Sequence, residues 1–132
     1  MSKVIEVSFP GGKRVDAHFG NTVVRTDQPE KYGGEGSAPE PFQLFLASIA
    51  TCGGIYALGF CQARNIPADK MKFNMTCDFD PEVKRYTKMT FNLKLPPEFP
   101  EKLIGAVKRS IDMCAVKRHI VDSPEFEVLA DY

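Results

Sequence analysis

The stretch LASIATCGGIYAL, residues 46–58, decides how the rest of the chain has to fold. It is long enough for a helix and carries no charge, yet a cysteine and two successive glycines stand at its centre. Each glycine in a helix interior costs roughly 1 kcal/mol relative to alanine. A close packing partner, or a chemical site beside Cys52, has to offset that cost.

Length, charge and cysteine spacing narrow the class of protein. The chain of 132 residues is long enough for one domain with a hydrophobic core, so we expect a single domain over residues 1–132. Its 17 basic and 17 acidic side chains cancel, which argues against nucleic acid or an anionic membrane as a partner. The first residues contain no apolar signal segment, and the four cysteines lack the spacing of a disulfide framework or a structural zinc site. We therefore expect a cytoplasmic protein.

Alternating apolar and polar residues, punctuated by glycine and proline, predict the elements of the chain. Strands are predicted at residues 3–9, 13–19, 22–27, 71–79, 84–95 and 125–131. Helices are predicted from about 41 to 64, within 96–114 and near 115–121. The Gly- and Pro-rich residues 27–41 form the longest loop, and Pro39 and Pro41 fit the start of the long helix. The order β-β-β-α-β-β-α-α-β is that of an α+β domain.

The long helix raises the question of what covers it. Residues 41–63 contain no charge, and this length could also span a bilayer. Gln43, Ser48, Thr51 and the glycine pair favour a soluble protein instead, in which a helix apolar on all sides is buried on all sides. One small domain offers too little material for that, so a second subunit is the natural cover.

A helical wheel divides this helix into two stripes. One is bulky and is predicted to cover the sheet: Phe42, Phe45, Leu46, Ile49, Tyr56 and Phe60. The other is made of smaller residues: Gln43, Ala47, Ala50, Gly54, Ala57 and Cys61. Because small residues let another backbone approach closely, we predict that the second stripe meets another helix, such as its own mate across a twofold axis.

The four cysteines differ in what their positions allow. Cys52 and Cys61 cannot form a disulfide, because they point to opposite sides of the helix and lie roughly 13 Å apart along its axis. Cys61 and Cys77 fit small core residues. Cys114 precedes the basic residues of AVKRH, whose charge would favour a reactive thiolate, although a buried cysteine beside a solvated turn fits as well. If any pair carries out redox chemistry, elimination leaves Cys52 with Cys114.

The segments SAPEPFQLFLASIATCGG and IDMCAVKRHIV together resemble the OsmC/Ohr family of thiol peroxidases. In that family a proline-initiated helix carries the first cysteine, here Cys52. A second cysteine in a C-P-V context ends a later helix, here Cys114 followed by Ala115 and Val116. The resemblance implies an intertwined homodimer with long buried central helices packed together. It also implies that the first cysteine attacks a hydroperoxide and that the second forms a disulfide, which an external dithiol reduces, with no metal or organic cofactor.

Two positions depart from the family pattern. Members with strong activity carry a glutamate where this chain has Phe42, and an arginine after the first Gly-Gly, where this chain has Lys13 and then Arg14. Arg14 or Arg25 could hold the thiolate instead, and Gln43 could replace the glutamate. The apolar side chains that could line a pocket for alkyl peroxides, or equally belong to the core, are Phe42, Phe45 and Tyr56.

The sequence therefore predicts a cytoplasmic homodimeric enzyme that reduces organic hydroperoxides, without a nucleic-acid or membrane partner. The alternative is a non-catalytic domain of the same fold that senses redox state or binds an apolar ligand at the dimer interface. The loss of the family's arginine and glutamate positions favours that alternative. A third hypothesis, a small membrane-associated protein, depends only on residues 41–63.

Overall fold

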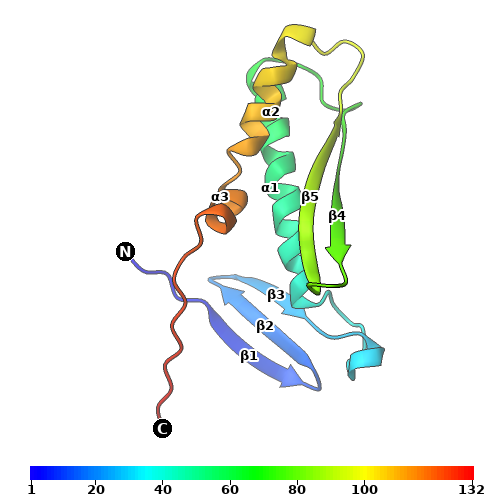
Figure 1. Ribbon diagram of the computed structural model, residues 1–132. Helices are drawn as coiled ribbons and strands as arrows, with labels where there is room; N and C mark the ends of the chain where they lie inside the picture. Colours follow the sequence, from blue (N-terminus) through cyan, green and yellow to red (C-terminus); the bar gives the residue numbers. More distant parts are fainter. The chain divides into compact units, whose positions relative to one another are not determined.

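The computed structural model describes residues 1–132 and divides into two compact units, Met1–Ala47 and Ser48–Tyr132, which are described in turn (Figure 1). Helix α1, Pro41–Ala63, starts in the first unit and continues into the second. Its start at Pro41 agrees with the predicted start, because proline lacks the N–H that the first helical position leaves unpaired.

The first unit contains a three-stranded antiparallel sheet in the order β1-β2-β3. The strands are β1 (Glu6–Gly11), β2 (Arg14–Phe19) and β3 (Thr22–Thr26). The three predicted strands are therefore present, with ends that differ by up to three residues. Gly11 and Gly12 form the β1–β2 turn with φ of 141° and 60°, a conformation that side-chain-bearing residues rarely adopt.

The Gly- and Pro-rich loop after β3 is ordered around one carboxylate, that of Asp27, which is 1% exposed. It accepts the hydroxyl of Ser37 at 2.6 Å, the backbone N–H of Ser37 at 3.0 Å and that of Gln28 at 2.7 Å. These hydrogen bonds, the Ser37 hydroxyl foremost, lower the pKa of Asp27 from 3.8 to about 2. Gly34 completes the fold of the loop, because a Cβ there would lie 1.9 Å from the carbonyl oxygen of Gln28.

The second unit contains the rest of α1 and the remaining elements: β4 (Lys72–Asp80), β5 (Arg85–Lys94), η2 (Glu101–Leu103), α2 (Ile104–Asp112) and α3 (Ala115–Val121). β4 and β5 form an antiparallel hairpin whose turn is closed by a hydrogen bond of 2.8 Å from the Lys84 N–H to the Asp80 carbonyl. On the outer face of the hairpin, the Asn92 amide donates to Asn74 and to Thr76, each at 2.8 Å. The alternation in the sequence thus gives a hairpin with one polar and one apolar face.

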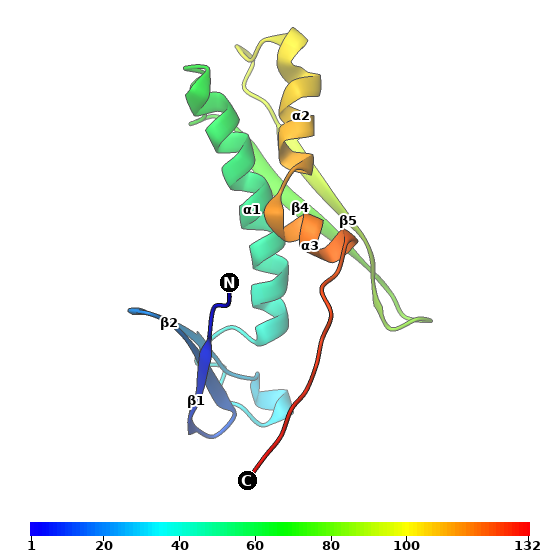
Figure 2. The same cartoon turned by 90° about the vertical axis from the view of Figure 1, so that its left-hand side faces the viewer.

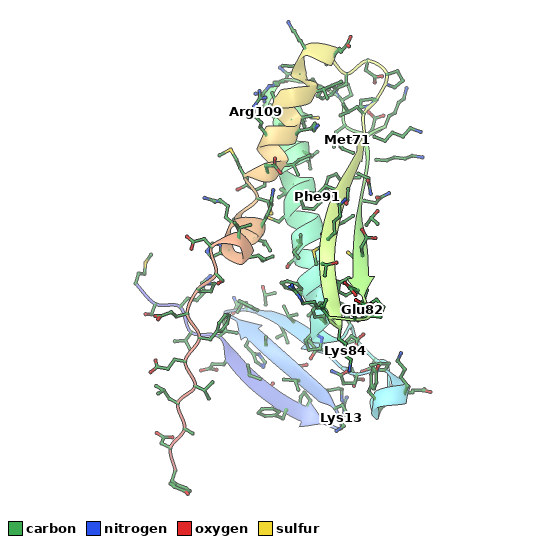
Figure 3. All side chains as sticks on the ribbon, viewed as in Figure 1. Lys13, Met71, Glu82, Lys84, Phe91 and Arg109 are labelled. Carbon is green, nitrogen blue, oxygen red and sulfur yellow. The ribbon has the colours of Figure 1, made fainter.

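The contact between α1 and this hairpin explains one of the two glycines. A Cβ on Gly53 would lie 3.1 Å from Cζ of Phe73 and 3.2 Å from Cε1 and Cζ of Phe91. The two rings stack on each other with centroids 5.5 Å apart, and Phe91 lies between β5 and α1 (Figure 3). Because the hairpin places two phenylalanine rings at this point, the helix needs a residue without a side chain there.

The predicted assignment of the helix faces is wrong in part: Ile49 and Phe60 of the bulky stripe are buried, but other members of both stripes lie differently from the prediction. Ala57 and Cys61, which were assigned to the face of a second subunit, are fully buried within this chain. Phe42 and Phe45, assigned to the sheet, are 50% and 37% exposed. Beside the middle of α1, the space next to Gly53 is taken by Phe73 and Phe91. The core cluster formed where α1 meets α2 contains Phe60, Cys61, Phe99 and Val107.

Two predictions for the C-terminal third also differ from the structure. The helix predicted within 96–114 is regular only over α2, preceded by η2, because prolines at 96, 97 and 100 cannot donate helical hydrogen bonds. α2 runs beside α1, and α3 follows it after a change of direction (Figure 2). The strand predicted at 125–131 is absent: residues 122–132 form no regular structure. A strand needs a neighbouring strand to pair with, and this segment has none within the chain.

By length and composition alone, α1 would be able to cross a membrane. The buried helices of soluble proteins meet the same criteria, so this is weak evidence. Only 28% of its most apolar window is buried within one chain. The remaining surface of the helix carries no charged side chain.

Candidate functional site: two thiols between α1 and α3

The second unit brings two cysteine side chains together. Cys52 lies in the middle of α1, and Cys114 is the residue immediately before α3, with extended ψ of 125°. Both are free thiols, and they are hydrogen-bonded to each other. Two cysteines that are distant in the sequence are thus in side-chain contact, which their spacing alone could not show.

Three kinds of group surround the sulfur of Cys52. Partial burial by itself would raise the pKa of this thiol. The opposing interactions are the hydrogen bond from the Cys114 thiol, those from the backbone N–H groups of Val116 and Ala115, and the positive charge of Arg118. These outweigh burial, so the pKa of Cys52 lies below its ordinary value of 9.0. The thiolate, which is the nucleophilic form of cysteine, is favoured at this position.

Cys114 is shifted in the other direction. It is completely buried, and burial is the main cause that raises the pKa of its thiol. Its hydrogen bond to Cys52 and the negative charge of that sulfur raise the pKa further, against the backbone N–H groups of Lys117 and Val116. Cys114 therefore keeps its proton and donates it to Cys52. The pair consists of one sulfur held as a nucleophile and one held as a thiol beside it.

The other two cysteines have different surroundings. Cys61 is buried in the core between α1 and α2, and burial raises its thiol pKa against the nearby charge of Arg64. Cys77 is half-buried on β4, where it pairs across the hairpin with Met89. No group of three or more His, Cys, Asp or Glu side chains is arranged to hold a metal ion.

The polar residues predicted to assist Cys52 lie in the first unit. Arg14 is exposed in the β1–β2 turn, where its Nε donates to the Gly11 carbonyl at 3.2 Å. Arg25 is exposed on β3, opposite Asp16 in the strand register. The Gln43 side chain accepts the backbone N–H of Glu40 at 3.0 Å, which caps the start of α1. A role for these side chains at the thiols stays a prediction.

The predicted pocket residues fall into two groups. Phe42 and Phe45 pack against each other in the first turns of α1, with ring centroids 5.3 Å apart. Tyr56 lies in the second unit, on the wall of a shallow groove of about 530 Å³ between α1 and α2. Arg64 and Arg109 also line this groove, and Arg64 stacks on the ring of Phe60 at 3.6 Å from its centroid.

Sequence reasoning missed the contribution of α3. The basic residues after Cys114 were considered as neighbours of Cys114, whereas the charge of Arg118 and two backbone N–H groups act on Cys52. The backbone donors come from the first residues of α3, Ala115 and Val116, whose N–H groups have no partner within the helix. The signal available in the sequence was the helix that starts directly after a cysteine.

Comparison with known proteins agrees with this fold. The OsmC-like protein family model matches residues 34–128. An osmotic stress induced and detoxification response protein from Psychrobacter arcticus 273-4 superimposes with a TM-score of 0.71 at 20% identity, over 89% of this chain and 88% of its own. No curated protein matches the chain by sequence.

Two further solved structures are named for organic hydroperoxide resistance. The protein OsmC of Legionella pneumophila has a TM-score of 0.53 at 20% identity, covering 91% of this chain and 89% of its own. OhrB of Bacillus subtilis has a TM-score of 0.52 at 16% identity, covering 92% and 93%. Identities this low show the fold, and the predicted α+β arrangement is confirmed. Because the family model covers most of the sequence, the chain belongs to the OsmC-like protein family.

Proposed function

We propose that this protein reduces organic hydroperoxides with its two hydrogen-bonded thiols. The Cys52 thiolate attacks the terminal oxygen of the hydroperoxide, the O–O bond breaks, and Cys52 becomes a sulfenic acid while the alkoxide takes up a proton and leaves as an alcohol. The Cys114 thiol then attacks the Cys52 sulfur, which releases water and forms a disulfide. An external dithiol reduces that disulfide and is itself oxidised, which returns both thiols.

The observation that carries this proposal is the contact between the two thiols together with their opposite pKa shifts. A nucleophile of lowered pKa beside a protonated partner is what a two-cysteine cycle requires, because the first step uses a thiolate and the second needs a nearby thiol. The structural relatives from Legionella and Bacillus, named for organic hydroperoxide resistance, support the choice of peroxide as the oxidant. Family membership supports a place in the response to oxidative stress.

The assembly that we propose is a homodimer in the cytoplasm. The face of α1 that looks away from the hairpin is uncharged and exposed, with Thr51 and Ile55 along it and Ile55 57% exposed. A second copy of the same helix would bury this face without introducing charge. In that assembly Arg14 or Arg25 would assist Arg118 at the thiolate, with Gln43 in support, and Phe42, Phe45 and Tyr56 would line the substrate pocket.

The test is consumption of cumene hydroperoxide in the presence of excess dithiothreitol. We expect Cys52→Ser to lose turnover. In a separate reaction without dithiothreitol, which would itself reduce a sulfenic acid, Cys114→Ser should consume one equivalent of peroxide and stop at a sulfenic acid that a dimedone probe traps. Cys77→Ser is the matched control, because Cys77 is also half-buried but lies on β4, where it pairs across the hairpin with Met89, and it should keep full activity. Full activity in Cys52→Ser would contradict the proposal.

The same assay separates the enzyme from a non-catalytic redox sensor or apolar ligand-binding domain. A sensor consumes at most one equivalent of peroxide for each chain, whereas an enzyme consumes many while dithiol remains. Recovery of the protein in the soluble fraction without detergent would remove the membrane-associated alternative that rests on α1.

A further inference from the structure

The groove between α1 and α2 carries two positive charges and no negative one. Arg64, the residue directly after α1, lines it from one side and Arg109 of α2 from the other. No aspartate or glutamate belongs to its lining. The ion pair of the chain joins Lys117 to Asp112, so neither arginine is neutralised by a carboxylate. The groove therefore presents two unpaired guanidinium groups.

The two guanidinium groups lie toward the same end of the groove. α1 ends where α2 starts, at one end of the helix pair (Figures 1 and 2), and Arg64 stands at that end. Arg109 is further along α2, but its side chain turns back toward the start of the helix, as Figure 3 shows. Its Nη1 lies 3.2 Å from the place that a Cβ on Gly105 would occupy. The guanidinium can lie there because Gly105, one helical turn earlier, has no side chain.

Most hydrogen-bond donors of this cluster have no acceptor in the chain. Arg64 stacks on the ring of Phe60, and its Nη1 donates to the Phe60 carbonyl at 3.1 Å, which holds the guanidinium in place and leaves its other N–H groups available. Arg109 donates no hydrogen bond within the chain. The hydroxyl-bearing side chains of Tyr56 and Ser110 line the same groove and add further donors. The groove is thus prepared for an acceptor that comes from outside.

These donors match a phosphate group more closely than a carboxylate. A phosphate monoester carries a charge of about −1.5 to −2 at pH 7 and three acceptor oxygens, so it can satisfy both arginines at once. The planar fork of arginine also binds phosphate oxygens in pairs. The lining includes Ile55, Ala106 and Met113, which are apolar. The remainder of the ligand is therefore expected to be apolar.

We propose that this groove binds the phosphate monoester of a small apolar alcohol. The phosphate lies between Arg64 and Arg109, and the apolar body extends along the groove to Met113. The volume of about 530 Å³ is within the range of about 300–1,000 Å³ that is typical of small-molecule sites. Neither Cys52 nor Cys114 lines the groove, so this binding is separate from the proposed reduction of peroxides and involves no covalent step.

Methionine methyl NMR of the full chain, with hexyl phosphate as the probe, tests the proposal. Met113 lines the groove and is 62% exposed, so its methyl signal should shift as the probe is added. Met89 lines the other groove, between β5 and α2, and its signal should stay in place. Hexanol keeps the apolar body without the phosphate and should bind at least about tenfold more weakly. Hexanoate, with a single charge, should bind severalfold more weakly than hexyl phosphate.

Variants at neighbouring positions of α2 make the test specific. Arg109→Gln should weaken the binding of hexyl phosphate about tenfold, and it should leave the fold intact because Arg109 is exposed. Arg109→Lys keeps the charge without the fork and should give an intermediate affinity. Lys108→Gln is the matched control, since Lys108 lines the other groove, and it should keep the affinity of the parent protein. Cys52→Ser should keep it too, so failure of the peroxidase proposal and failure of this one are distinguishable.

Four results would overturn the proposal. A Met113 signal that does not move in excess hexyl phosphate would show that the groove is closed to solutes. Equal affinities for hexyl phosphate and hexanol would show that the arginines contribute nothing. An affinity for hexanoate that equals the affinity for hexyl phosphate would show that the groove does not recognise phosphate. Equal losses in Arg109→Gln and Lys108→Gln would show a general attraction of charge in place of a site.

Discussion

The close packing at Gly53 gives a prediction whose size follows from the structure. Carbon atoms in contact prefer separations of about 3.5–4.0 Å, so a Cβ at 3.1–3.2 Å from two rings already requires them to move by a few tenths of an ångström. Replacing glycine by alanine inside a helix normally raises the unfolding free energy by about 1 kcal/mol. Gly53→Ala should therefore show no such increase. Gly53→Leu adds atoms for which there is no space, and overpacking costs about 1–3 kcal/mol, so we expect unfolding free energy to fall by about 2 kcal/mol.

Gly59 is the matched control on the same helix. No atom lies within 4 Å of a Cβ built there, so Gly59→Ala should raise the unfolding free energy by about 1 kcal/mol. Urea unfolding at one fixed protein concentration measures all three variants. If Gly53→Ala gains as much stability as Gly59→Ala, or if Gly53→Leu is as stable as the parent protein, the rings of β4 and β5 do not press on the helix and the reasoning is refuted.

Three further predictions concern the thiol, the loop and the core. Arg118→Gln removes a positive charge that lowers the pKa of Cys52, so the pH at which iodoacetamide alkylates Cys52 should rise, while Lys117→Gln should leave it in place. Because the folded pKa of Asp27 is depressed from 3.8 to about 2, the loop that it holds should stay ordered below pH 3.8 and loosen only as the pH falls through about 2, which amide chemical shifts would follow. Val107→Ala removes two fully buried methyl groups, at about 0.8 kcal/mol each plus the cavity left behind, so urea unfolding should report a loss of about 2 kcal/mol.

The elements that periodicity predicted well are those whose pattern is local. The hairpin of β4 and β5 alternates between polar and apolar residues over its whole length, and α3 was placed correctly from 115 to 121. The faces of α1 could not be predicted in the same way, because all sides of this helix are apolar. Which side meets the sheet depends on Phe73 and Phe91. Their position beside Gly53 follows from the tertiary structure and not from the local sequence.

The C-terminal strand shows a second limit of sequence reasoning. The alternation over 125–128 is present, but a strand forms only where another strand offers its edge. Within this chain residues 122–132 form no strand, although their pattern is that of one. The role of Asp27 in the long loop could not be predicted either. Glycine and proline content does not show which side chain accepts hydrogen bonds from the loop's N–H groups.

The candidate site was predictable in part. Elimination and resemblance both pointed to Cys52 and Cys114, and the structure places these two thiols in contact. Their opposite pKa shifts depend on burial and on the N–H groups at the start of α3, which spacing in the sequence does not give. Arg118 was overlooked as a neighbour of Cys52 because it is distant from that residue in the sequence.

The central claim, that these two thiols form one redox pair, is tested most directly by mass. The reduced protein is treated with one equivalent of cumene hydroperoxide, and its intact and peptide masses are measured before and after dithiothreitol. We expect the loss of two hydrogens, located in a link between Cys52 and Cys114 that dithiothreitol reverses. An unchanged mass, or a disulfide that involves Cys61 or Cys77 instead, would contradict the account.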